Sequence, residues 1–431
     1  MIMHYYYMTR KVVFLLILIF TLNLAVFAAE GDELTLKVAV MGPGNELYFW
    51  WGHIALVIED AKTYESYFFD YGIFDFQQEN FFVNFAFGRL LYCCGVSYTK
   101  RVLDHYKKTN RDVFIYTLDL PPETKVKIYN FARNNVLPEN KDYYYHHFKD
   151  NCSTRIRDII DIATEGQFKK QFENEKSRFT LRQHVRRHTY FSPAGDWFLN
   201  FLMGQVIDTP ITVWEDMFLP SEVGNRIEDF WYTDDSGQAR KLAASVEILN
   251  TAMNRPPVLE QPRKQWIRQL LFSLVLSAIF GFFFFLYKKN IKAGRVLAGI
   301  SMSFCALFFG AAGLLLYFMN LLTNHDYTYQ NFNMIFCTPL LLAAVPAGLI
   351  FAFTKNEKKL IKYDQLSRII WILTVIGIFI SMIIKIFPWF YQDNLTDQML
   401  MLPLALLFAF HPAGLKEFLY KYFPILKRKL G

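Results

Sequence analysis

The chain has 431 residues, of which 53% are hydrophobic and 18% aromatic, and its formal net charge is +7. These averages conceal two unlike parts of the chain. Residues 30–265 are mixed and rich in charge, whereas the chain from Leu270 onward consists of long apolar runs, and this difference excludes a single water-soluble domain. The positive charge gives no reason to expect a nucleic-acid partner, since much of it lies between the apolar runs, where membrane topology explains it. Five scattered cysteines do not suggest a disulfide framework, and no motif implies a metal or an organic cofactor.

Residues 1–29 have the pattern of a secretory signal peptide. Arg10 and Lys11 precede a long apolar run, and small residues begin at Ala28. We expect cleavage after Ala28, with an uncleaved membrane anchor as the alternative. In either case residues 30–264 are expected to form a domain in the periplasm.

The periplasmic part has the sequence pattern of a mixed α+β domain. Alternating apolar residues and turn signals predict strands at residues 34–41, 54–59, 66–70, 91–96 and 113–118, of which the second and third form a hairpin. Helical spacing and capping residues predict helices at residues 80–87, 98–108, 121–135, 152–164 and 240–250, and a capping box at residues 212–215. We expect a mostly antiparallel sheet with helices packed against it.

The C-terminal part, residues 265–431, is predicted to be a transmembrane region with about five helices and a basic cytoplasmic tail. The apolar runs are residues 270–287, 296–322, 334–353, 369–387 and 399–410, and the last is short and contains Pro403. Basic residues lie between the first and second runs, between the third and fourth, and in the tail, whereas the loops 323–333 and 388–397 contain no Lys or Arg. This distribution predicts a multi-pass protein of the inner (cytoplasmic) membrane, with the domain and both uncharged loops outside.

Two residues of the domain suggest chemistry. Cys152 is expected at the start of a helix, where the positive end of the macrodipole favours the thiolate. His53 opens a predicted strand, which can hold an imidazole rigidly as a base for the thiol. The alternatives are that Cys152 is a small buried hydrophobic residue and that His53 is a hydrogen-bonded core histidine.

A thiolate at a helix start with an imidazole from a strand resembles the geometry of papain-type thiol enzymes. Here the histidine precedes the cysteine along the chain, as in the circularly permuted branch of the NlpC/P60 superfamily. The expected fold is therefore a papain-like, permuted NlpC/P60-like α+β periplasmic domain followed by an α-helical transmembrane bundle.

Several short motifs follow one another in a specific order. They are Gly42-Pro43-Gly44-Asn45-Glu46-Leu47-Tyr48, Gly52-His53, Tyr71-Gly72-Ile73-Phe74-Asp75-Phe76, Gly88-Arg89-Leu90, Asp150-Asn151-Cys152-Ser153-Thr154-Arg155 and His325-x-x-Thr328-x-x-Asn331-x-Asn333. Each motif alone is weakly specific, but the set resembles the Lnb-type lipoprotein N-acyltransferase family, whose members join a periplasmic domain of this kind to a C-terminal membrane region. His146 and His147 depart from the resemblance, because aromatic residues are expected just before the Asp-Asn-Cys motif.

The resemblance implies a two-step acyl transfer. A membrane phospholipid gives an acyl chain to the enzyme thiol, which forms a thioester and releases a lysophospholipid. The α-amino group of a diacylated apolipoprotein, which begins with diacylglyceryl-cysteine, then accepts the chain. A thioester is a good acyl donor to amines, and both substrates are membrane-bound, which explains why a thiol domain is fused to several spans.

We assign Cys152 as the nucleophile and His53 as its general base. A third polar residue should orient His53, and Asp70 and Tyr71 on the neighbouring predicted strand are the candidates. Asn151 or Asp150 is expected to cap the helix, and Asn151 is expected to act as a cap rather than to react.

Five other residues are candidates for substrate binding. Arg155 and Arg89 could bind phosphate, and His325, Asn331 and Asn333 could line the substrate entrance on the outer face of the membrane. For Arg155 the alternative is a structural ion-pair network with Arg157 and Asp158. For His325, Asn331 and Asn333 it is an ordinary solvated loop that caps the bundle.

Two other functions stay open from the residues alone. One is a membrane-anchored NlpC/P60-like cell-wall amidase or peptidase, although a soluble wall substrate needs only a tether rather than several spans. The other is a non-catalytic membrane scaffold with a degenerate thiol fold.

Overall fold

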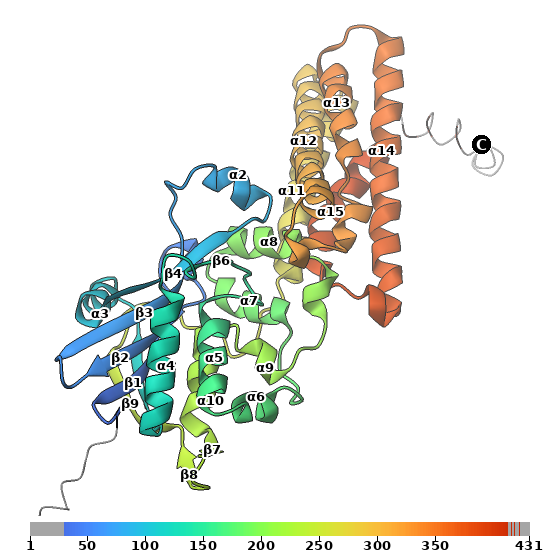
Figure 1. Cartoon of the computed structure of the whole chain (residues 1–431). Helices are drawn as coiled ribbons and strands as arrows, with labels where there is room; N and C mark the ends of the chain where they lie inside the picture. Colours follow the sequence, from blue (N-terminus) through green and yellow to red (C-terminus); the bar gives the residue numbers. More distant parts are fainter. Residues whose placement is uncertain (1–29, 413–414, 416–417, 419–421, 423–431) are drawn as a thin grey trace, which may run out of the picture.

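The computed structural model describes residues 30–412, 415, 418 and 422, so the predicted signal peptide and the basic residues of the tail lie outside the described residues. An α+β domain comes first along the chain, and a bundle of long apolar helices follows it (Figure 1).

Among the described residues, seven antiparallel strands form the main sheet, in the order β6-β4-β3-β2-β1-β5-β9. The strands are β1 (Leu34–Met41), β2 (His53–Asp60), β3 (Glu65–Ile73), β4 (Leu91–Tyr98), β5 (Val113–Leu118), β6 (Asp142–Tyr144) and β9 (Ala243–Asn250). All five predicted strands are confirmed, and β2 and β3 form the expected hairpin. A separate two-stranded ribbon consists of β7 (Trp231–Thr233) and β8 (Ala239–Lys241).

The helix predicted at residues 240–250 is wrong, because this segment ends β8 and forms β9. β9 pairs with β5, placing Val246 opposite Tyr116 and Ile248 opposite Phe114. Without β9, the outer edge of β5 would expose a row of unpaired backbone groups. This pairing with a strand more than a hundred residues earlier outweighs the local helical preference of the segment, and a sequence window cannot detect it.

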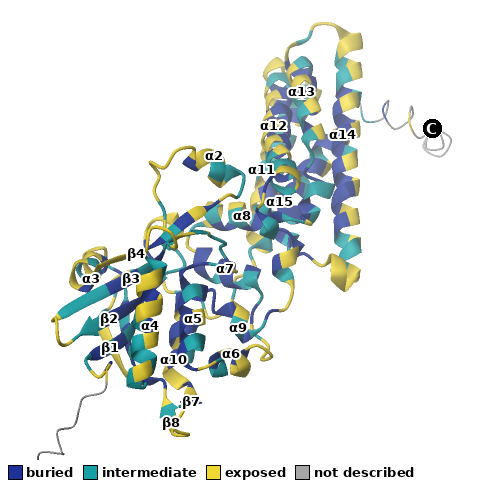
Figure 2. Ribbon diagram, in the orientation of Figure 1, coloured by how far each residue is buried: buried dark blue, intermediate teal, exposed yellow. Residues whose placement is uncertain are grey.

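Helices cover both faces of the sheet (Figures 1 and 2). On one face, Ile128, Ile156 and Ile227 bury the alternate side chains of β1 and β2 that point toward them. On the other face, Tyr106 packs against the remaining alternate side chains. The helices of the domain are α2 (Phe81–Ala86), α3 (Thr99–Lys108), α4 (Pro122–Asn135), α5 (Cys152–Ala163), α6 (Gln167–Phe172), α7 (Leu181–Thr189), α8 (Pro193–Leu202), α9 (Val213–Asp216) and α10 (Pro220–Asp229), with short 3₁₀ helices η1 (Leu47–Phe49) and η2 (Gln205–Asp208).

Among the described residues, four helical segments are long and apolar enough to cross a membrane, namely α11 (Trp266–Lys288), α12 (Lys292–Leu322), Phe332–Phe353 and Glu357–Ile386. The third segment is irregular and combines η4 (Phe332–Ile335), η5 (Pro339–Ala343) and α13 (Ala344–Phe353). The fourth combines α14 (Glu357–Ile383) with η6 (Ile384–Ile386). The fifth predicted span is the shorter apolar helix α15 (Leu395–Phe410), which contains Pro403.

Two loops of the helical bundle contact the α+β domain. In the first loop, the side-chain nitrogen of Asn331 donates to the carbonyl of Phe201 at 2.9 Å. In the second, the Gln392 side chain donates to the carbonyl of Met203 at 3.0 Å. These are the two loops that contain no Lys or Arg, so the structure places both beside the domain, as the distribution of basic residues predicted.

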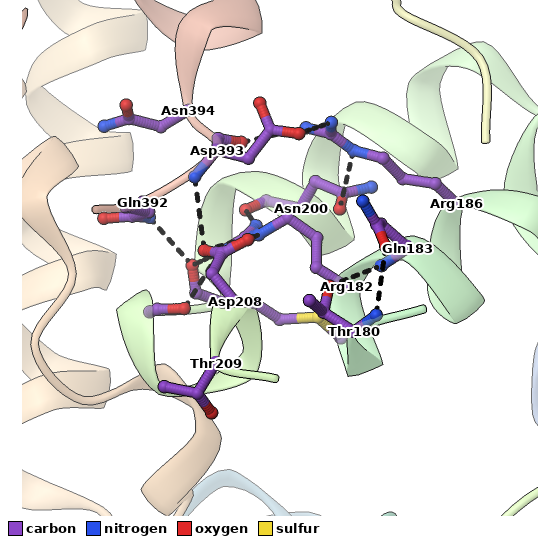
Figure 3. Close-up of polar contacts among 12 residues, drawn as sticks. Thr180, Arg182, Gln183, Arg186, Asn200, Asp208, Thr209, Gln392, Asp393 and Asn394 are labelled. Carbon is purple, nitrogen blue, oxygen red and sulfur yellow. Dashed lines mark hydrogen bonds and ion pairs between the residues drawn. The ribbon is translucent and has the colours of Figure 1, made fainter. Parts of the chain in front are cut away.

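A buried ion-pair network fastens α7 to this junction (Figure 3). Arg182 pairs with Asp208 at 2.8 Å and donates to three backbone carbonyls, including that of Asn200 at 2.8 Å. Arg186 pairs with Asp393 of the second loop at 2.5 Å, and the backbone amide of Asp393 donates to Asp208 at 3.2 Å. Charged groups that are largely shielded from water therefore join the domain to the bundle.

Candidate functional site

Helix α5 begins at Cys152 because Asn151 caps it. The Asn151 side-chain oxygen accepts from the amides of Ser153 at 2.8 Å and Thr154 at 2.9 Å, while the Thr154 hydroxyl accepts from the Asn151 amide at 2.8 Å. This is a complete capping box, and it confirms the expectation that Asn151 is the cap. The side-chain nitrogen of Asn151 also donates to the carbonyl of Phe218 at 2.9 Å, which anchors the start of the helix to the segment before α10.

The end of β3 approaches the start of α5 at a glycine. Gly72 has a φ of 88°, next to a register shift between Tyr71 and Ile73. A Cβ at this position would lie 3.2 Å from the ring of Tyr145 and 3.9 Å from the Cβ of Cys152. Glycine is therefore required by both the backbone conformation and the space, and it lets the strand pass directly beside the cysteine.

His53 reaches the same end of the sheet from β2. Ala55 pairs with Asp70, so two residues further along the two antiparallel strands His53 lies beside Gly72. Side chains alternate along a strand, so His53 and Ala55 point to the same face of the sheet, which α3 covers. Helix α5 packs on the opposite face. His53 and Cys152 therefore approach each other around the end of the strands rather than across one face.

Asp70 is the hydrogen-bond partner of His53. The Nε2 atom of His53 lies 2.6 Å from the Oδ1 atom of Asp70, and the two side chains are 12% and 22% exposed. Burial by itself lowers the pKa of His53, but the neighbouring Tyr106, Asp70 and Cys152 oppose it, and the pKa is raised well above its usual value. The imidazole is thus oriented by a carboxylate and inclined to hold a proton.

Tyr71, the other candidate for orienting His53, faces the opposite way. Its side chain is 2% exposed within the core on the α5 face, and its hydroxyl accepts from the Asn135 side chain at 3.3 Å. The alternation of the strand separates the two candidates, because Asp70 and His53 share one face and Tyr71 lies on the other.

Cys152 is buried, with 8% of the residue exposed. No hydrogen bond joins the thiol to the His53 ring among the described residues, although the charge of Cys152 contributes to the raised pKa of His53. The two groups are therefore electrostatically coupled neighbours whose direct contact needs a side-chain movement. Catalytic hydrogen bonds are often long without substrate and shorten in the complex.

Arg155 and Arg89 occupy different surroundings. Arg155 makes a bidentate ion pair with Asp150, at 2.5 and 2.8 Å, and stacks 4.1 Å above the ring of Tyr143. It lines a cavity of about 270 Å³ behind the start of α5. Arg89 is exposed and lies 5.7 Å above the ring of Phe87. Arg155 therefore has a structural ion pair, but its partner is Asp150, while Arg157 pairs with Asp158 at 2.8 Å.

His325, Asn331 and Asn333 are buried, at 4%, 3% and 0% exposed, so the alternative of an ordinary solvated loop is wrong. The His325 ring lies 2.9 Å from the carbonyl oxygen of Phe85, and Asn333 donates to Asp397 at 3.1 Å. The three side chains fasten the first membrane loop to the domain and to α15, and a contact with substrate stays a prediction.

His146 makes a second connection between the two parts. Its Nε2 atom lies 2.7 Å from Asp326, and Lys149 pairs with the same carboxylate at 2.5 Å. This carboxylate belongs to η3 (Asp326–Thr328) of the first membrane loop. Burial lowers the pKa of the adjacent His147 to about 4, so this ring is neutral at neutral pH. His146 and Lys149 thus hold the segment before Cys152 against the loop that contains Asp326.

Sequence reasoning missed two residues beside the site. The ring of Tyr106 lies 6.3 Å from that of His53, and Arg111 is sandwiched between Tyr106 and Phe49 at 4.6 and 4.4 Å. Arg111 is 2% exposed, its Nε donates to Gly42 at 2.8 Å, and its two terminal nitrogens have no acceptor among the described residues. No motif marks either residue, because the sheet order alone brings them to this end of the strands.

The arrangement has the parts needed for nucleophilic catalysis. Cys152, the candidate nucleophile, is the first residue of a capped helix and lies near the imidazole of His53. A carboxylate fixes that imidazole. Among the described residues, no group of three His, Cys, Asp or Glu side chains is placed to hold a metal ion.

Comparison with known proteins shows what the segment that carries this site is similar to. Residues 28–187 match the family model described as the Lnb N-terminal periplasmic domain, and the matched segment contains His53, Asp70 and Cys152. Searches of curated proteins and of solved structures gave no match. Residues 28–187 are thus similar to the Lnb N-terminal periplasmic domain, and in the described part of the chain four helices long and apolar enough to cross a membrane follow them.

Proposed function

We propose that this chain is a lipoprotein N-acyltransferase of the inner membrane, with its thiol domain in the periplasm. It moves an acyl chain from a membrane phospholipid, through a thioester on Cys152, to the α-amino group of a diacylated apolipoprotein. One observation carries the proposal. Cys152 begins a capped helix beside the bonded pair His53 and Asp70, in a periplasmic domain that is fastened to membrane helices.

In the first step, the thiolate of Cys152 attacks the ester carbonyl of the phospholipid and forms the new C–S bond. The carbonyl oxygen becomes an oxyanion, and the bond to the glycerol oxygen then breaks. The His53 imidazolium gives its proton to the leaving alkoxide, which departs as the lysophospholipid alcohol. A raised pKa of His53 suits this role, because the proton must be available at neutral pH.

The start of α5 provides a donor for the oxyanion. The amides of Ser153 and Thr154 are bonded to the Asn151 side chain, and that of Arg155 to the Asn151 carbonyl at 3.1 Å. The amide of Cys152 is the one in this turn for which the described residues supply no acceptor. It is adjacent to the attacking sulfur and belongs to the positive end of the helix, which is the position that acyl-transfer enzymes use.

In the second step, the neutral α-amino group of the acceptor attacks the thioester carbonyl. His53, now neutral, takes the proton from the amine as the amide bond forms, and the thiolate of Cys152 leaves. Asp70 holds the ring through Nε2, so Nδ1 is the nitrogen that exchanges protons. We therefore assign Asp70 as a positioning residue and propose a permuted papain-like arrangement for the domain.

The proposal is tested by trapping the intermediate. Purified chain incubated with phospholipid vesicles should carry one acyl chain on Cys152, detected by mass spectrometry and released by hydroxylamine. Cys152→Ala should carry none and should leave lipoproteins diacylated with a free amino terminus. Cys93→Ala, a matched loss of a partly exposed thiol, should keep both activities.

Two results would count against the proposal. Unchanged triacylation by Cys152→Ala, in cells without another such enzyme, removes it. Cleavage of muropeptides by the wild-type chain but not by Cys152→Ala would instead favour the cell-wall amidase.

A further inference from the structure

Helix α2 exposes an apolar surface without a protein partner in the described structure. Its sequence carries no charge, and Phe82, Val83 and Phe85 are 70%, 57% and 42% exposed. Phe76, in the preceding loop, is 52% exposed and contacts Phe82 with ring centroids 6.3 Å apart. Figure 2 shows α2 as a largely exposed segment that projects from the domain in the direction in which the bundle extends. Contiguous aromatic surface of this kind marks a site of interaction.

The surface of α2 continues onto a membrane-spanning helix. Phe87, directly after α2, stacks edge-on against Phe318 of α12 with centroids 5.5 Å apart, and its carbonyl accepts from the amide of Asn324 at 2.9 Å. Phe318 lies four residues before the end of α12, which places this contact roughly 6 Å inside the apolar span. The last residues of that span, Leu321 and Leu322, are 67% and 64% exposed, as expected of side chains that face lipid.

Aromatic rings lead from α2 to the nucleophile. Phe81 of α2 stacks on Phe74 at 6.0 Å, Phe74 contacts Tyr92 at 5.1 Å, and Tyr92 stacks on Tyr145 at 4.5 Å. The ring of Tyr145 in turn lies against Gly72, at the position where that strand passes Cys152. This series of ring contacts, here called the aromatic path, therefore connects the exposed helix with the position beside Cys152.

We infer that α2, with Phe76 and the side chains of Phe82, Val83 and Phe85, inserts into the outer leaflet of the membrane and brings lipid acyl chains to the aromatic path that leads to Cys152. The occupant of this surface is the hydrocarbon edge of the bilayer, because the surface is continuous with the lipid-facing end of α12. The uncharged helix suits that environment, and Arg89, exposed just beyond it, lies where phosphate groups begin. Insertion does not depend on the proposed function, whereas delivery of acyl chains rests on it.

Insertion can be measured without catalysis. Phe82→Cys and Tyr64→Cys, each in a Cys152→Ala background, are labelled with an environment-sensitive NBD fluorophore and placed in nanodiscs that contain doxyl-labelled lipid. Tyr64 is a matched control, since it is 93% exposed and the length of β2 puts it roughly 26 Å from His53 at the far end of the hairpin. The Cys152→Ala chain without an added cysteine gives the background from native thiols.

We expect the label at position 82 to be blue-shifted and quenched at least twofold by doxyl lipid, and the label at position 64 to be unaffected. Equal emission and equal quenching at the two positions would overturn the inference. The same equal emission and quenching would be seen if the surface bound a partner protein instead of lipid, because the nanodiscs contain no partner and the label at position 82 would stay in water.

Delivery is tested with variants that keep the catalytic residues. Phe82→Asp and Val83→Asp should slow thioester formation from bilayer phospholipid at least tenfold and leave the reaction with detergent-dispersed phospholipid unchanged, whereas Tyr64→Asp should affect neither. Equal loss with both donors would refute delivery by α2. Quenching at position 82 without thioester formation by the wild-type chain would contradict the proposed function but support insertion.

Discussion

The hydrogen bond between Asp70 and His53 decides the protonation of the site. Asp70 is among the neighbours that raise the pKa of His53 against the effect of burial. In Asp70→Asn the negative charge is lost but the shape is kept, so the pKa of His53 should fall. The imidazolium that protonates the leaving group is then lost at a lower pH, and the alkaline limb of the pH profile of thioester formation should move toward acid.

Loss of the Asp70 charge should also reduce kcat. Loss of correct proton transfer lowers rates by about 10²–10⁴-fold, so we expect kcat to fall by at least about 100-fold in Asp70→Asn. Asp60→Asn removes a carboxylate from the far end of the same hairpin and should leave the profile in place. A lower kcat with an unshifted alkaline limb would show that Asp70 supports the fold rather than the charge of His53.

At the residue scale, the sequence was informative where local rules apply. Asn151 as cap and Cys152 as first helical residue follow from the Asp-Asn-Cys segment alone. Asp70 and Tyr71 could not be separated, because the choice depends on which face of β3 meets α5. The sandwich of Arg111 between two rings was not predictable, since Phe49 and Tyr106 belong to segments far apart in the sequence.

At the element scale, Gly72 determines how closely β3 approaches α5. Gly72→Ala would place a Cβ 3.2 Å from the Tyr145 ring, in a backbone conformation with φ of 88°. The conformation itself should cost about 1 kcal/mol. Displacement of the Tyr145 ring, which packs against Gly72 beside Cys152, should add to that cost and slow thioester formation.

Gly237→Ala provides the matched control for this substitution. Its φ is 81°, and nothing lies within 4 Å of the added Cβ, so it has the same backbone cost without the contact. The midpoint temperature of thermal unfolding and the rate of thioester formation should therefore be lower in Gly72→Ala than in Gly237→Ala. Equal effects of the two variants would mean that the space beside Cys152 is not limiting.

Helices and strands were predictable where the residues of the segment itself determine its secondary structure. The hairpin of β2 and β3 and the helices α3, α4 and α5 carry their periodicity and turn signals locally. β9 did not, because its pairing with β5 is a property of the sheet and not of the segment. The helices α7 and α8 also went unpredicted, and their role as the platform for the membrane loops could not be read from composition.

At the scale of the whole molecule, the proposed catalysis at a membrane surface requires the α+β domain to keep a fixed position on the bundle. His325, Asn331 and Asn333 illustrate why the sequence could not show this. Their polar character predicted a solvated or substrate-lining loop, yet all three are buried in contacts between the two parts. Buried polar groups need partners, and those partners come from distant segments.

The ion pair between Arg182 and Asp208 lies at the centre of this junction (Figure 3). The two side chains are 1% and 4% exposed, and Asp208 also accepts from the amide of Asp393 in the second membrane loop. Asp208→Asn leaves the charge of Arg182 buried without its counter-ion, which typically costs about 3–5 kcal/mol. We therefore expect a large fall in the thermal unfolding midpoint of the chain in nanodiscs.

The same substitution should loosen the second membrane loop. Trp389 is 67% exposed, so chymotrypsin can report this change, and cleavage near it should accelerate in Asp208→Asn. Glu59→Gln breaks the partly exposed pair with Lys37, at 2.7 Å, which contributes at most about 1 kcal/mol and should change neither measurement. If Asp208→Asn lowered the midpoint without faster cleavage, the pair would stabilise the domain alone. Faster cleavage together with slower acylation from bilayers would show that the junction holds the thiol at the membrane surface.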